Sequence, residues 1–258
     1  MDPVLFQIGP VVVRWYGLMM ALTIVTSLWA AARWGPRFGV SRAQIDRIAF
    51  WLIILLFAGA RLAYVLSHPG EFRQPLEILR VWHGGLSSHG AIVAGLLYVW
   101  AMARRTGIPI WSLADTFAWP IPLGNVFVRI GNFMNGELYG DPTTLPWGVQ
   151  FPGAAGGPRH PLQIYEMLLA AIILLAAWRV AGRRAFPGQV WWVIVVLTSL
   201  GRVAFDALRS EDHVLWGLFA YGQVAAVALL VIGLWFLLAR SSRSGSAPRS
   251  PLEADASR

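Results

Sequence analysis

The sequence contains no cysteine and no lysine, and each absence excludes a class of chemistry. All 21 basic residues are arginine. Without a cysteine thiol the chain has no disulfide, no thiolate metal ligand and no cysteine nucleophile. Without a lysine amine it cannot form a Schiff base, which excludes a retinal-type pigment.

Charge is also scarce, and the apolar residues are abundant. Only 13% of the residues are charged, against about 25% in an ordinary soluble domain, whereas 57% are hydrophobic. The apolar residues, which include 14 Trp and 13 Phe, fall in long blocks rather than in short periodic stripes. The composition therefore predicts an all-α membrane protein, and it excludes a soluble enzyme and a nucleic-acid-binding protein despite the net charge of +8.

Seven apolar blocks approach the roughly 20 residues that a helix needs to cross a bilayer. The blocks lie at approximately Trp15–Ala32, Ile48–Leu66, Leu86–Met102, Ile110–Ile130, Gln163–Trp178, Gln189–Leu208 and Tyr221–Ala239. The fourth contains Pro120 and Pro122, which predict either a kink or a broken helix. The expected fold is a polytopic bundle of seven transmembrane helices.

Arginine placement predicts the orientation of this bundle, because basic residues are retained on the cytoplasmic side. One set of loops, with the C-terminal tail, carries 13 arginines and the other set carries five. The N-terminus is thus expected outside and the C-terminus inside, and the first block is expected to be a retained anchor because no basic region precedes it. The long loops at 67–85 and 131–162 then form a small periplasmic cap.

The predicted membrane domain covers residues 1–240, and a different composition follows it. Residues 241–258 are rich in Ser, Ala, Pro and charge, which predicts a disordered cytoplasmic tail.

Five charged residues fall inside or beside predicted spans, where each costs roughly 2.5–3.5 kcal/mol on insertion scales. They are Arg61, Asp115, Arg129, Arg202 and Asp206. Arg202 and Asp206 are four residues apart and could simply pair on one helix face, while Asp115 is close enough to the inner boundary to be interfacial. Arg61 and Arg129 have no acidic residue one turn away. They require an anion, which is either a distant carboxylate such as Glu137 or Glu166, or a lipid phosphate held by bidentate hydrogen bonds.

Three polar segments stand out near the predicted outer ends of the spans. His89 follows a Gly- and Ser-rich stretch from Gly84, and it is either a structural histidine or a base that titrates near neutral pH. The densest segment, 129–140, contains Arg, two Asn, Glu and three Gly, more than a polar helix cap requires. Residues 159–166 have Pro161 near the first turn of a predicted helix and Glu166 just inside it.

Together these segments resemble the prolipoprotein diacylglyceryl transferase family of the bacterial inner membrane. The resemblance covers residues 14–240 in five motifs, namely Arg14–Met19, Gly59–Val65, Gly84–Gly90, Arg129–Gly140 and Arg159–Glu166. It implies transfer of the diacylglyceryl group of phosphatidylglycerol to the lipobox Cys thiol of a preprolipoprotein signal peptide. It implies neither a cofactor nor a metal, and the absence of cysteine fits a nucleophile that the substrate supplies.

The resemblance also implies which residues act. Tyr16, His89, Arg129, Asn132, Glu137, Gly140 and Arg202 occupy the positions of the family's essential residues, with Arg61, Asp206 and Arg209 as supports. Arg129 and Arg202 would hold the phosphate and stabilise the charge on the leaving glycerol phosphate. His89 would help to deprotonate the incoming thiol.

The chain departs from the usual family pattern at four positions. Val126 and Val128 interrupt a Gly-rich run, Thr198 replaces a common Tyr, and Asp141 stands where a basic residue is common. A homologue that binds phosphatidylglycerol without turnover therefore remains an alternative. A seven-helix transporter or proton relay, with ion pairs along a pathway, is the other.

Overall fold

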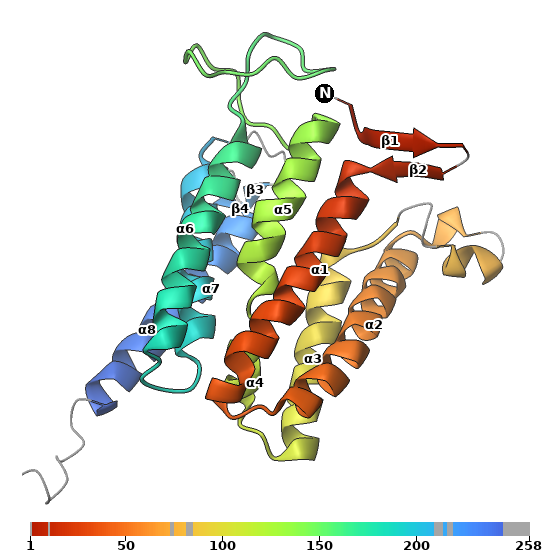
Figure 1. Ribbon diagram of the computed structural model, residues 1–258. Coiled ribbons are helices and arrows are strands. Elements are labelled where there is room, and N and C mark those ends of the chain that lie inside the picture. The colour runs from red at the N-terminus through yellow and green to blue at the C-terminus, as the bar shows by residue number, and fades with distance from the viewer. Residues whose placement is uncertain are drawn as a thin grey trace, which may run out of the picture. The chain divides into compact units, whose positions relative to one another are not determined.

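The computed structural model describes residues 2–9, 11–72, 75–80, 85–208, 214–215 and 219–244 (Figure 1). The chain divides into two compact units, one formed by residues 28–117 and the other by residues 1–27 with 118–258. Helix α1 (Trp15–Trp34) contributes residues to both. Arg209, Gly84 and residues 245–258 lie outside the described residues, so the predictions made for them stay predictions.

The unit formed by residues 28–117 is built on two long neighbouring helices, α2 (Arg42–Ser67) and α3 (Ser88–Thr106). Ser41 starts α2 with a capping box, in which Ser41 and Gln44 satisfy each other's backbone N–H groups. The short helices η1 (Gly35–Phe38), η2 (Pro69–Glu71), η3 (Pro75–Leu79) and α4 (Ile110–Thr116) complete the unit. Its buried apolar core joins the start of α2 to α4 through Ile45, Ile48 and Leu113.

The other unit is a row of helices, each packed on the next: α5 (Pro120–Asn135), α6 (Leu162–Gly182), α7 (Gln189–Asp206) and α8 (Tyr221–Ser244) (Figure 1). Aromatic contacts fix the neighbours. The rings of Trp119 and Trp178 lie 5.9 Å apart, and those of Trp192 and Phe236 lie 5.4 Å apart. The strands β3 (Val214–Leu215) and β4 (Phe219–Ala220) pair before α8 begins.

Five described helical segments are long and apolar enough to cross a membrane. They are Trp15–Phe38, Arg42–Ser67, Leu162–Gly182, Gln189–Asp206 and Gly222–Ser242. Helix α3 has 19 residues but less apolar character. The fourth predicted block is broken, because α4 ends at Thr116 and α5 starts afresh at Pro120, which lacks the N–H that a continuous helix would use.

The structure differs from the sequence-based expectation at both ends of the chain. Strands β1 (Val4–Ile8) and β2 (Val11–Arg14) form an antiparallel hairpin that leads directly into α1. The β-branched residues of this segment favour extended backbone, and Gly9 supplies a positive φ of 58° at the turn. At the other end, α8 continues to Ser244, so residues 241–244 of the predicted disordered tail are helical.

Candidate functional site

Arg129 lies in the last two turns of α5 and is held by both its own helix and α6. Its Nε forms an ion pair with Glu166 Oε2 of α6, and its Nη1 donates to Asn132 Oδ1 at 3.2 Å. The side chains of Arg129 and Glu166 are only 17% and 12% exposed. The anion that Arg129 requires is thus provided by the chain itself, from the neighbouring helix.

A second layer of hydrogen bonds extends this pair through Glu137. Asn132, 5% exposed, donates through Nδ2 to Glu137 Oε1 at 2.7 Å, and Asn135 donates to the same oxygen at 3.3 Å. From α6, the buried Gln163 donates through Nε2 to the Glu137 backbone carbonyl. Helix α5 ends here with Gly136 in the left-handed region, which turns Glu137 back toward Asn132. Leu138 also has a positive φ, 61°, a strained backbone beside the network.

Gly140 lies in the loop that connects α5 to α6, where it packs against the residues before α6 and after α7. Its N–H donates to the His160 carbonyl at 2.8 Å, and the next N–H, of Asp141, donates to the Leu208 carbonyl beyond α7 at 3.0 Å. A Cβ at position 140 would lie 2.7 Å from that Leu208 oxygen and 2.9 Å from His160 and Leu162. The loop can therefore join the ends of α6 and α7 only with glycine at this position.

Arg202 and Asp206 form the pair that their spacing on one helix predicts. Arg202 Nε lies 2.8 and 2.9 Å from the two carboxylate oxygens of Asp206, whose side chain is 4% exposed. Gly222, at the start of α8, leaves room for the guanidinium, because a Cβ there would be 2.9 Å from Nη2. Arg202 is thus held between α7 and α8.

Tyr16 lies in the first turn of α1, and a small residue of α5 allows its close approach. A Cβ on Gly131 would lie 3.2 Å from Tyr16 Cα, so the two helices meet backbone to backbone two residues beyond Arg129. The tyrosine remains 40% exposed. Within this unit the structure therefore brings Tyr16, Arg129, Asn132 and Glu137 to one region of α5.

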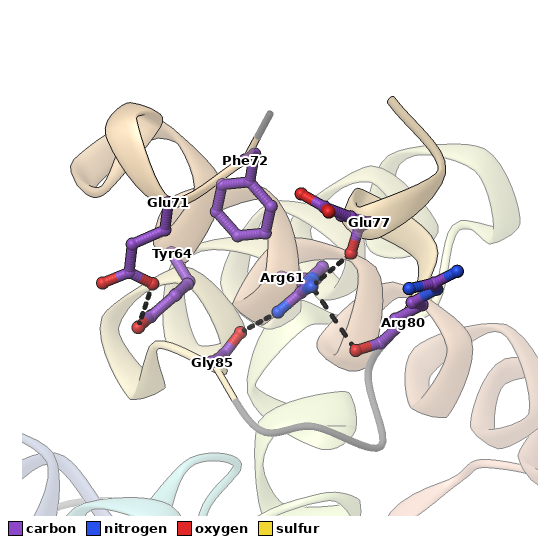
Figure 2. A pocket seen from close by; sticks show the side chains of 7 residues that line it. All are labelled: Arg61, Tyr64, Glu71, Phe72, Glu77, Arg80 and Gly85. Carbon is purple, nitrogen blue, oxygen red and sulfur yellow. Dashed lines mark hydrogen bonds between the residues drawn. The ribbon is translucent and has the colours of Figure 1, made fainter. Parts of the chain in front are cut away.

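Arg61 belongs to the other unit, and its surroundings differ from the sequence-based expectation. Its Nε, Nη1 and Nη2 donate to the backbone carbonyls of Ile78, Gly85 and Glu77 at 2.8, 2.9 and 2.8 Å. Figure 2 shows the contacts with Gly85 and Glu77. The ring of Phe72 lies 4.9 Å from the guanidinium carbon. The segment that follows α2 therefore satisfies a charge for which we expected an acidic partner or a phosphate, because peptide carbonyls are also good acceptors for guanidinium donors. A cavity of about 240 Å³ adjoins it.

His89 and Asp115 also belong to this unit. His89 is exposed in the first turn of α3, and among the described residues its imidazole has no hydrogen-bond partner. The role of His89 as a base stays a prediction. Asp115 is 0% exposed within α4, and its depth relative to the membrane boundary stays a prediction.

Sequence reasoning missed one residue of the site and left the role of another undecided. Gln163, 1% exposed, holds the Glu137 backbone and was not expected to take part. Glu166 was one of several possible anions, and the structure selects it for Arg129. Gln163 and Glu166 are three residues apart on one face of α6, a spacing that could have indicated a shared polar contact. Within the described ranges, no three His, Asp or Glu side chains gather in a way that could hold a metal ion.

Comparison with known proteins assigns the chain to a family. The family model of prolipoprotein diacylglyceryl transferase matches residues 3–239. This chain belongs to that family. A relative from Nitratidesulfovibrio vulgaris (strain Miyazaki F), named phosphatidylglycerol–prolipoprotein diacylglyceryl transferase, is 39% identical over 96% of this chain and 97% of its own length. Relatives with the same name from Rhizobium leguminosarum bv. trifolii and Geobacter sulfurreducens are 38% and 36% identical, over 92% and 94% of this chain and 91% and 96% of their own lengths.

The packing at Gly140 predicts a large effect from a single methyl group. We expect Gly140→Ala to lower the melting temperature of the purified protein, since the new Cβ would clash with a backbone oxygen that cannot rotate away. The matched control is Gly124→Ala in α5, whose Cβ would meet only Thr23, at 3.6 Å, and which gains helix propensity. A melting temperature for Gly140→Ala equal to that of Gly124→Ala would show that the loop adjusts freely.

Proposed function

We propose that this protein transfers the diacylglyceryl group of phosphatidylglycerol to the thiol of the lipobox cysteine of a preprolipoprotein, forming a thioether and releasing glycerol phosphate. The observation that carries the proposal is the family match over residues 3–239, which includes the whole Arg129 network. The product begins the maturation of a bacterial lipoprotein. The alternative of a transporter or proton relay has no comparable support.

The chemistry of the reaction explains why arginines serve it. The thiolate sulfur attacks the glyceryl carbon, the carbon–oxygen bond to the phosphate breaks, and the electron pair leaves on that oxygen. The phosphate changes from a diester with one negative charge to a monoester with almost two. Guanidinium groups that hold the phosphate therefore stabilise the transition state more than the bound lipid, which is the condition for a higher kcat.

Arg129 and Arg202 are the residues that we assign to the phosphate. Each is oriented in advance by a carboxylate, Glu166 and Asp206 respectively, and each uses its Nε for that contact. A guanidinium has five N–H donors in a planar fork, so Nε can stay on the carboxylate while terminal N–H groups turn to a phosphate oxygen. The paired carboxylates thus act as orienting groups, which keep the arginines from being buried unpaired before lipid binds.

The remaining assignments follow from the positions of these residues in the family's motifs. His89 is the proposed base that takes the proton of the thiol, whose free pKa of about 8.5 leaves little thiolate at neutral pH. Asn132 and Glu137 hold Arg129 through hydrogen bonds, and Gly140 allows the close packing of the loop after them. Tyr16 places a partly exposed phenol ring beside α5. Arg209 is proposed as a further support.

The finer topology belongs to the same proposal. We infer seven crossings, with α3 and the broken α4–α5 segment added to the five apolar segments, in a bacterial inner membrane. The N-terminus and the loops at 67–85 and 131–162 lie on the periplasmic side, where they form the cap, and the C-terminus lies in the cytoplasm. The arginine asymmetry of 13 against five supports this orientation.

The absence of native cysteine makes the orientation directly testable. We expect Gln7→Cys and Ala155→Cys, both at exposed positions, to react with a membrane-impermeant maleimide in intact spheroplasts. Ala185→Cys, exposed between α6 and α7, should react only after the membrane is permeabilised. The cysteine-free parent chain gives the background. Labelling of Ala185→Cys in intact spheroplasts, with Ala155→Cys protected, would reverse the proposed orientation.

The activity is tested with labelled phosphatidylglycerol and a lipobox peptide. We expect the purified protein to form a thioether product with the Cys peptide and none with the same peptide carrying Ser. Arg129→Ala should lower kcat/KM by roughly 100-fold or more, as the loss of a charge-stabilising donor typically does. Asp46→Asn, in an exposed ion pair, is the control and should keep full activity.

Three outcomes separate the alternatives. Folded protein that binds phosphatidylglycerol without forming product would support the non-catalytic homologue. Charge movement across liposomes without product would support a transporter. Equal products from the Cys and Ser peptides would contradict a thiol nucleophile.

A further inference from the structure

Three consecutive residues of α2 each hold one residue of the short segment that carries His89. Gly59 lies against Gly90, the Ala60 carbonyl accepts a hydrogen bond from the Ser87 N–H at 2.9 Å, and Arg61 Nη1 donates to the Gly85 carbonyl at 2.9 Å. All six residues lie in the unit formed by residues 28–117, so the arrangement is internal to it. We call residues 59–61 the α2 template.

The contact between the two glycines sets how closely the helices approach. A Cβ on Gly59 would lie 2.7 Å from the Gly90 carbonyl oxygen, and a Cβ on Gly90 would likewise clash with the Gly59 carbonyl oxygen. The two backbones therefore touch, as small residues allow in membrane helices. Gly90 follows His89 directly, so this contact fixes the first turn of α3 against α2 and with it the direction of the His89 side chain.

Arg61 holds the entry to that turn. Its planar fork donates at once to the carbonyls of Glu77, Ile78 and Gly85, which joins η3 to the residues just before α3. Gly85 can accept this contact because it has a φ of 76° and because a Cβ there would lie 2.7 Å from Arg61 Nη1. Arg61 is only 8% exposed. Its donors are thus directed at the protein backbone.

We propose that Arg61 is a positioning residue, which acts on the transfer reaction through the placement of His89 on the α2 template and not by binding the lipid phosphate. The proposal rests on the proposed function, since it assumes that His89 takes the thiol proton. It assigns Arg61 a different role from Arg129 and Arg202, although all three are intramembrane arginines. The same placement explains why Gly59 and Gly90 are glycines.

The two roles predict different kinetic effects for Arg61→Lys. Lysine keeps the charge, which a phosphate would still attract, but its single ammonium cannot span three separate carbonyls. If Arg61 positions His89, kcat falls by roughly 10- to 100-fold, as misplacement of a reacting group does, while KM for phosphatidylglycerol stays within about twofold. If Arg61 binds the phosphate, KM for phosphatidylglycerol rises as well, because a contact with the bound lipid is lost.

A second variant tests the template without altering any charge. Gly59→Ala should push α3 away and give the same pattern, a lower kcat with an unchanged KM. Gly95→Ala is the matched control, because it lies on the same α2–α3 contact but its Cβ would meet only the ends of the Leu56 and Leu52 side chains, at 2.9 and 3.8 Å. It should retain wild-type kinetics. A wild-type kcat in Gly59→Ala, or a raised KM in Arg61→Lys, would overturn the proposal.

Amide hydrogen exchange in nanodiscs provides a readout that does not depend on activity. Ser87 donates to Ala60, so its exchange should accelerate in Arg61→Lys and stay at the wild-type rate in Gly95→Ala. Unchanged exchange at Ser87 in Arg61→Lys would overturn the proposal even in an inactive protein. Wild-type protein that forms no thiol-dependent product would refute the proposed function instead. An active wild type with a fully active His89→Ala variant would remove the assumption about His89 and overturn the proposal.

Discussion

The ion pair between Arg129 and Glu166 is the constraint on which the arrangement of α5 and α6 depends. A guanidinium in an apolar helix cannot be left without a partner, and a carboxylate alone beside it would be equally costly. The pair fixes the rotation of the two helices relative to each other. Once they are fixed, Asn132, Glu137 and Gln163 complete the network, and each needs the others to satisfy its polar groups. The network thus orients Arg129 before any ligand arrives.

Glycines make room for the polar groups in both units. Gly131 admits Tyr16, Gly140 admits the Leu208 carbonyl, and Gly222 admits the Arg202 guanidinium. In the other unit, Gly59 and Gly90 let α2 and α3 touch near His89. Between apolar helices in a bilayer there is little hydrophobic gain from association, so close contact and hydrogen bonds supply the attraction. Glycine at these positions therefore gives the polar groups the room that their contacts need.

Interactions within one helix could be predicted from the sequence, whereas interactions between distant segments could not. The pairing of Arg202 with Asp206 and the break at Pro120 follow from local spacing and from proline chemistry, and both are observed. The helix start after Pro161 is also observed. The partner of Arg129 required the packing of α5 on α6, and the partners of Arg61 required the path of a loop whose carbonyls have no signature in the sequence. The family resemblance predicted which residues act, but it did not predict what holds them.

The role of the Arg129–Glu166 pair is tested most directly by the kinetics of Glu166→Gln. If Glu166 orients Arg129, the variant loses kcat by roughly 10-fold or more because the guanidinium is no longer fixed. Its affinity for phosphatidylglycerol should be equal to or tighter than that of the wild type, since a competing carboxylate has been neutralised. A wild-type kcat, or a loss of lipid affinity as large as in Arg129→Ala, would contradict the orienting role of the pair.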